Sequence, residues 1–243
     1  MAKETEAYIV LANQRQYVQI EEGASYQTVG ASQPGGDNNV PSGPLSRLST
    51  NSLPAGKSLT MLTLTDTVVV LLPVTGGLAY YINRKSAADV ECYFLEPGQV
   101  GYLTLRAGTS YTVSNPYEAE TIQWTDCWLT TVDVPGEAVL LGTFDLTLGN
   151  VLLPLFNETT PTLRHDLFIG RFDGRREVTY RVEKTPDGLP KTVFVLVLSG
   201  VFEVANRLLH EQDGLLLCYD EAATVECEAL SNNAILLLFD LAS

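Results

Sequence analysis

Hydrophobic residues along this chain come in short runs, and the lengths of these runs predict strands. The runs span about four to eight residues, are rich in Val, Leu, Thr, Tyr and Phe, and are bounded by Gly, Pro, Asn or Asp. TVVVLLPV at 67–74 is typical. No segment carries a sustained period of 3.6 residues with helix caps. The pattern therefore predicts an all-β chain with short helical turns at most.

The two halves of the chain repeat one pattern. VVVLLPVTGGLAYYI at 68–82 resembles TVFVLVLSGVFEVAN at 192–206, and each reads as strand, glycine turn and strand. IQWTDCWL and ILLLFDL then end the two halves. A repeated strand pattern predicts two tandem β-barrels, each closed on an apolar interior. We place these barrels at residues 1–135 and 136–243.

Residues 24–58 depart from the strand pattern. This segment is packed with Gly, Ser, Pro, Asn and Thr. Such composition is typical of a loop, so we expect a long loop that covers one barrel mouth or is partly disordered.

Composition narrows the possible partners and the compartment. The 243 residues include 15 basic and 29 acidic ones, for a net charge of -14 at pH 7. A surface of this sign repels phosphate backbones and anionic lipids, so we expect neither nucleic acid nor membrane as a partner. The polar, charged start predicts no signal peptide, and no apolar run is long enough to span a bilayer. Four unclustered cysteines read as reduced thiols, which favours a cytoplasmic protein.

A spacing of glycines and apolar residues between 56 and 76 resembles a known metal-binding motif. Gly56, Leu62, Leu64, Val69 and Gly76 reproduce the spacing of the first cupin motif, G-x5-H-x-H-x4-E-x6-G. Each histidine and the acid of that motif is replaced here by an aliphatic residue. The spacing therefore indicates the fold without the ligands.

The second cupin motif is altered in the same way. Gly108, Tyr111 and Asn115 keep the spacing G-x2-H-x3-N, with tyrosine in place of histidine. The whole chain has two histidines, His165 and His210, which cannot form a three-histidine metal site.

Further landmarks resemble the pirin-like bicupin family, which includes bacterial quercetin 2,3-dioxygenases. AGKSLTMLTLTD at 55–66 is similar to that family's A-G-x5-H-P-H-x-D, and SYTVSNP at 110–116 is similar to R-H-S-E-x-N-P. RHDLFIGRF at 164–172 and ILLLFDLA at 235–242 resemble its H-Q-D and L-L-F-D-L segments. The resemblance covers nearly the whole chain and implies a bicupin of two RmlC-like jelly-roll barrels.

The resemblance also implies what this chain lacks. The family's paired histidines fall on Leu62 and Leu64, its third histidine on Tyr111, and its glutamate on Val113. Leucine and valine offer a metal no donor atom. We therefore expect no metal, no cofactor and no transfer of the family's dioxygenase activity. Because pirins are linked to transcription-factor binding, the resemblance also suggests a protein partner.

Loss of the metal ligands predicts a largely apolar interior with one phenol in the first barrel. That interior either packs shut or binds a small apolar or aromatic ligand. The candidate ligand-binding residues are Tyr111, Leu62, Leu64, Val113 and Trp124. The Tyr111 hydroxyl then contacts either the ligand or a backbone carbonyl. Trp124 and Trp128 share one face of a strand, and the sequence leaves open whether that face is the inside.

Three functions follow from these observations. The first is a metal-free binding or regulatory module. The second is a cofactor-independent enzyme that uses Tyr111 with a carboxylate such as Asp66 for acid–base chemistry. The third is a residual quercetinase-like oxygenase.

The remaining polar residues are expected to have structural or surface roles. His165 and Asp166 are adjacent on a strand and therefore point to opposite faces, so they are poorly placed to pair. His210 lies in a turn and is expected to be exposed. An anionic ligand could bind isolated arginines, but such residues are more often found on the surface, where they aid solubility; here they are Arg15, Arg47, Arg106 and Arg164.

Overall fold

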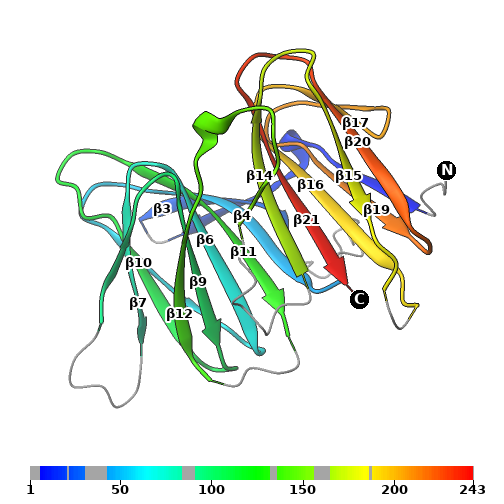
Figure 1. Cartoon of the computed structure of the whole chain (residues 1–243). Helices are drawn as coiled ribbons and strands as arrows, with labels where there is room; N and C mark the ends of the chain where they lie inside the picture. Colours follow the sequence, from blue (N-terminus) through cyan, green and yellow to red (C-terminus); the bar gives the residue numbers. More distant parts are fainter. Residues whose placement is uncertain are drawn as a thin grey trace. The chain divides into compact units, whose positions relative to one another are not determined.

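The computed structural model describes residues 6–20, 22–30, 43–83, 91–131, 136–155, 165–185 and 188–242, which Figure 1 traces by colour along the chain. Within these ranges the chain is built from strands, with 3-10 turns at Ala12–Gln14 (η1) and Leu146–Leu148 (η2) and no α-helix. No helix in the described part is long and apolar enough to cross a membrane. The prediction of an all-β chain is confirmed.

The first of two compact units, here called the first barrel, takes Gln16–Ala31 and Leu45–Thr143. The strands of its larger sheet are β2 (Gln16–Ile20), β3 (Gly23–Val29), β4 (Leu45–Leu53), β6 (Thr67–Thr75), β9 (Gln99–Leu105), β11 (Ile122–Thr130) and β12 (Ala138–Thr143). The strands of its smaller sheet are β5 (Ser58–Leu62), β7 (Leu78–Asn83), β8 (Tyr93–Leu95) and β10 (Ser110–Ser114). Apolar side chains from both sheets, including Val69 and Leu103 on one and Ile82 and Val113 on the other, form a single core between them.

The second barrel takes the N-terminal segment through Arg15 and the chain from Phe144 onward. The strands of its larger sheet are β1 (Glu6–Val10), β13 (Leu153–Pro154), β14 (His165–Phe172), β16 (Lys191–Ser199), β19 (Gly214–Tyr219) and β21 (Ala234–Ala242). The strands of its smaller sheet are β15 (Glu177–Val182), β17 (Phe202–Val204), β18 (Arg207–Leu209) and β20 (Ala223–Ala229). Its core likewise joins both sheets, with Val195 and Leu238 from one and Phe202 and Val225 from the other.

Strand order confirms the internal repeat. The first barrel's larger sheet contains the run β9-β6-β11-β4, and the second barrel's contains β19-β16-β21-β14. The smaller sheets run β5-β10-β7-β8 and β15-β20-β17-β18. The two orders agree at each position, so both barrels have the same jelly-roll topology.

The expected barrel boundaries of 1–135 and 136–243 need correction at both ends of the first barrel. β1 pairs with β19, and Glu6 lies opposite Cys218, so the N-terminal strand completes the second barrel. β12, beyond residue 135, pairs with β9 and closes the edge of the first barrel. Which sheet edge a terminal strand joins depends on long-range pairing, and a repeat in the sequence does not encode it.

The expectation of a long loop over 24–58 was wrong for much of that segment. β3 spans Gly23–Val29, and β4 runs from Leu45 to Leu53 in the larger sheet, between β3 and β11. Residues 31–42 of the segment lie outside the described ranges. Ser, Thr and Asn made LSRLSTNSL resemble a loop, yet these polar side chains belong to a buried strand.

Candidate functional site

Leu62 and Leu64 do not line the first barrel, contrary to the sequence prediction. Their side chains are 52% and 80% exposed, whereas Met61 is 7% exposed and belongs to the core. Successive residues of a strand point to opposite faces, so a register one residue away moves the whole set from inside to outside. The inward positions of β5 are therefore Leu59 and Met61.

Tyr111 and Val113 lie in the interior, and so does Trp124, whose face the sequence had left open. All three side chains are 0% exposed and belong to the core of the first barrel. On the neighbouring strand β5, Tyr111 lies opposite Met61 and Val113 lies opposite Leu59. The corrected set on β5 and β10 forms an apolar surface carrying one phenol.

The Tyr111 hydroxyl has side-chain partners, and neither is the backbone carbonyl considered from sequence. It accepts a hydrogen bond from Trp128 Nε1 at 3.2 Å and contacts Met61 Sδ at 3.4 Å. Trp128 packs against the core, so the face shared by Trp124 and Trp128 is the inside. Burial, with a smaller contribution from Asp126, raises the pKa of Tyr111 well above its ordinary value, so the phenol stays protonated.

Facing this apolar surface, β3, β4 and β11 contribute a buried polar surface that the sequence analysis missed. Residues directly opposite in an antiparallel ladder share a face. Ser25, Asn51 and the core residue Trp124 form one inward row, and Ser49 and Asp126 form the next. We call Ser25, Ser49, Asn51 and Asp126 the polar wall. Each of the four is at most 1% exposed.

Several atoms of the polar wall have no hydrogen-bond partner among the described residues. They are Ser25 Oγ, Asn51 Oδ1, Asn51 Nδ2, Asp126 Oδ1 and Asp126 Oδ2. Leaving a buried polar group unpaired costs about 1–3 kcal/mol, and more for a charged group. Folded proteins contain few such groups, so five neighbouring atoms in this state call for an explanation.

Asp126 is the electrostatic centre of the polar wall. Burial raises its pKa, while Arg47, with Nε 3.7 Å from Asp126 Oδ1, lowers it. The polar groups of Asn51, Ser49 and Trp128 also lower the pKa of Asp126. None of them meets the geometry of a hydrogen bond to either carboxylate oxygen. Arg47 is not the isolated surface residue expected from sequence, because its guanidinium lies over the Trp128 ring, 5.1 Å from the centroid. A signal for Asp126 was present in WTDCW, where an acid shares a strand face with two tryptophans.

The other sequence candidates lie apart from this site. Asp66 accepts a hydrogen bond from the Ala107 backbone at 2.9 Å and so holds a turn rather than assisting Tyr111. His165 is 8% exposed on β14 and Asp166 is exposed, in keeping with opposite faces. His210 lies in an exposed turn, as predicted.

Comparison with solved structures places the architecture. YhhW from Escherichia coli matches with a TM-score of 0.80 and 15% identity, covering 98% of each chain. The bacterial pirin YhhW in complex with nickel(II) matches at 0.78 over 97% of this chain and 99% of that one, again with 15% identity. The fold is that of a pirin-like bicupin. Quercetin 2,3-dioxygenase from Acinetobacter baumannii matches at 0.69 with 14% identity, over 98% of this chain and 86% of that one. The sequence itself matches no family model and no curated protein.

The pirin-like bicupin fold implies a metal in the first barrel, and the residues present do not fit one. A divalent transition metal needs several nitrogen, sulfur or carboxylate donors within one coordination shell. At the inward positions of β5 and β10 this chain has Leu59, Met61, Tyr111 and Val113. Within the described residues, no three His, Cys, Asp or Glu side chains are grouped to hold a metal ion. The expectation of a metal-free protein stays a prediction, which elemental analysis of the purified protein checks.

Proposed function

We propose that the first barrel is a binding module for a small aromatic molecule with polar substituents, and that it binds this molecule without a metal. The proposal keeps the aromatic ligand expected from sequence and adds a polar side to it. One side of the interior, with Val113 and Met61, suits a flat apolar surface. The other side, the polar wall, suits hydroxyl, amine or carbonyl groups.

The observation that carries this proposal is the set of unpartnered atoms on Ser25, Asn51 and Asp126. Asn51 offers both a donor and an acceptor, Ser25 offers a hydroxyl, and Asp126 offers acceptors beside Arg47. The indole Nε1 of Trp124 is also buried, has no hydrogen-bond partner in the described part of the chain, and adds one more donor. A ligand that satisfied these groups would recover the cost of burying them.

Binding is favoured over catalysis by the state of Tyr111 and Asp66. The cofactor-independent enzyme considered from sequence needs a phenol and a carboxylate acting together. Instead, the Tyr111 hydroxyl is engaged by Trp128 and the Asp66 carboxylate by the Ala107 backbone. A protein partner stays a prediction that no feature of the first barrel bears on.

The proposal is tested by identifying what the purified protein carries. The protein is denatured in methanol and the extract is analysed by liquid chromatography and mass spectrometry. We expect a stoichiometric aromatic compound, which is retained by the control Ser52→Leu and lost from Asn51→Leu. Ser52 is the neighbour of Asn51 on the opposite face of β4. Comparing the two variants therefore isolates the effect of the inward side chain. An empty extract from the parent protein, or equal amounts from both variants, would contradict the proposal.

Quercetin serves as a defined probe, because it is a flat aromatic molecule with several hydroxyl groups. Trp124 and Trp128 are the only tryptophans in the chain, and both face the first barrel's interior. We expect quercetin to quench their fluorescence saturably and to be recovered unchanged. Asn51→Leu should weaken this binding about tenfold, which corresponds to one lost hydrogen-bonded group. Consumption of quercetin by the protein would support the residual oxygenase instead.

A further inference from the structure

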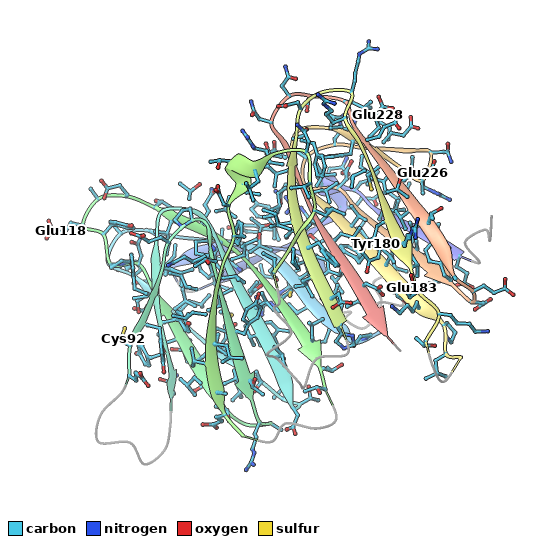
Figure 2. All side chains as sticks on the ribbon, viewed as in Figure 1. Cys92, Glu118, Tyr180, Glu183, Glu226 and Glu228 are labelled. Atoms are coloured by element: carbon cyan, nitrogen blue, oxygen red, sulfur yellow. The ribbon has the colours of Figure 1, made fainter. Side chains whose placement is uncertain are left out.

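A second polar group lies at one end of the second barrel's interior. On β21, Leu236 and Leu238 point into the core, and two residues further along the same face lies Asp240. Asp166 on β14 lies directly opposite Asp240. Lys191 begins β16, and Tyr180 reaches over from the smaller sheet, where Figure 2 labels it on β15. We call Asp166, Tyr180, Lys191 and Asp240 the acid site.

The hydrogen bonds of Asp240 use one of its oxygens and leave the other unpaired. Asp240 Oδ2 accepts from the Tyr180 hydroxyl at 2.7 Å and from Lys191 Nζ at 2.8 Å. Asp240 Oδ1 is buried and has no partner among the described residues. The carboxylate itself is 3% exposed, so bulk water does not satisfy this oxygen. A buried acceptor in this position is suited to a donor from a ligand.

The charges of the acid site do not balance. Asp166 and Asp240 bring two carboxylates, and Lys191 brings one ammonium group. Partial burial and the Asp240 carboxylate raise the pKa of Asp166, while Lys191 lowers it. Burial and the Asp240 carboxylate raise the Tyr180 pKa, and the negative charges of Asp166 and Glu183 raise it further. The surroundings therefore favour one further cation.

We propose that the acid site binds the ammonium group of a small primary amine that carries an aromatic or apolar carbon group. An ammonium ion has three donors and no acceptor. Asp240 Oδ1, the Asp166 carboxylate and the oxygen of the Tyr180 hydroxyl are three acceptors, because that hydroxyl donates its own hydrogen to Asp240. The Phe168 ring lies 5.2 Å from the Tyr180 ring at 58° and supplies an apolar surface for the carbon part. This second site is independent of the ligand proposed for the first barrel.

An amine fits the acid site better than a metal ion or an anion. A metal ion needs several His, Cys or acidic ligands together, and the described residues contain no group of three. An anion would meet two carboxylates and one lysine. Asp166 is exposed at the end of β14, so one of the two carboxylates of the acid site is open to solvent.

The test uses phenethylammonium chloride as the probe and 2-phenylethanol, its uncharged counterpart, as the ligand control. Melting temperature is measured at pH 7.5 and low salt on the full chain. Phenethylammonium at about ten times its Kd should raise the melting temperature by about 3–6 °C, because it binds the folded state alone. 2-Phenylethanol at the same concentration should leave it unchanged.

Variants assign the effect to this site. Asp240→Asn and Asp166→Asn should each abolish the shift, and Lys191→Met should increase it because the competing internal cation is gone. Asp126→Asn in the first barrel should keep the full shift, which separates this proposal from the one made for the first barrel. If Asp240→Asn does not fold, the result for Asp166→Asn decides the test, because Asp166 is exposed and its substitution should be tolerated. No amine-specific shift in the parent, or an equal shift in the parent and Asp166→Asn, would overturn the proposal and leave a proton shared between the two acids as the explanation.

Discussion

The two barrels share one strand order, but their matching strands direct different kinds of side chain into the interior. In the second barrel, β14 and β21 present Phe168, Phe172, Leu236 and Leu238 to the core. In the first barrel, the corresponding strands β4 and β11 present Ser49, Asn51, Trp124 and Asp126. In the second barrel, the polar residues Asp166 and Asp240 lie at one end of the inward face of β14 and β21, and the middle of that face is apolar.

This difference separates two roles of a barrel interior, which are stabilising the fold and binding a ligand. Burial of apolar side chains is the main source of folding stability, and the second barrel uses its wall in that way. The first barrel gives up part of this stabilisation along β4 and β11, because unpaired polar groups in a core are unfavourable. A wall that costs stability and carries unpartnered donors and acceptors is where a ligand site is expected.

The largest expected effect distinguishes the two barrel interiors by substitution of one buried side chain in each. Phe202 is fully buried in the second barrel, and its ring meets Phe172 edge to face at 6.0 Å. Phe202→Ala should lower the free energy of unfolding by about 3–5 kcal/mol. Asn51→Leu should change it by less than about 1 kcal/mol or raise it, since it removes an unpaired buried amide. Urea unfolding followed by far-UV circular dichroism measures both. A cost above about 2 kcal/mol for Asn51→Leu would show that the polar wall is structural.

A smaller contrast compares the two barrel tyrosines. Tyr180 donates to a buried carboxylate, so Tyr180→Phe should cost about 1.5–3 kcal/mol. Among the described residues, the Tyr111 hydroxyl bonds to an indole and a thioether, which are weaker partners, so Tyr111→Phe should cost about 1 kcal/mol. The same urea titrations rank the two substitutions. The reverse order would mean that the Tyr111 contacts carry more stability than their chemistry implies.

The smallest contrast is in pH dependence, because Arg47 offsets part of the cost of burying Asp126. The pKa of Asp126 is raised above its unfolded value of about 4, so the folded chain holds this proton more tightly than the unfolded chain. The associated stability is present below about pH 4 and is lost as the pH rises through the folded pKa. Asp126→Asn should therefore lose less stability than the parent between about pH 4 and 7.

Tryptophan fluorescence in urea follows the pH effect in the first barrel, since both tryptophans lie there. Asp166→Asn is the matched variant in the second barrel. Its effect has the same sign, because burial also raises the pKa of Asp166, but it should be smaller since this residue is more exposed. Parallel pH profiles for the parent and Asp126→Asn would show that Asp126 is not destabilised by burial.

The strand runs and glycine spacing predicted the fold, because apolar periodicity and turn residues are local properties. The repeat between 68–82 and 192–206 was enough to predict two barrels. The pairing of β1 with β19 could not be predicted in this way, since it joins residues about two hundred positions apart.

The candidate site was predicted in part. Tyr111, Val113 and Trp124 are inside, but the alignment to the metal motif was one residue away from the true inward face of β5, which put Leu62 and Leu64 outside. The polar wall was missed for a related reason. Ser49 and Asn51 made β4 resemble a loop, because sequence patterns assume that buried positions are apolar.

A high-resolution crystal structure of the purified protein tests the central claim most directly. It would show what lies against Asn51 and Asp126 in the first barrel. We predict density for an organic molecule that donates to Asp126 and pairs with both atoms of the Asn51 amide. Ordered waters alone on these atoms, or direct hydrogen bonds among Ser25, Asn51 and Asp126 that leave no group unpaired, would contradict it.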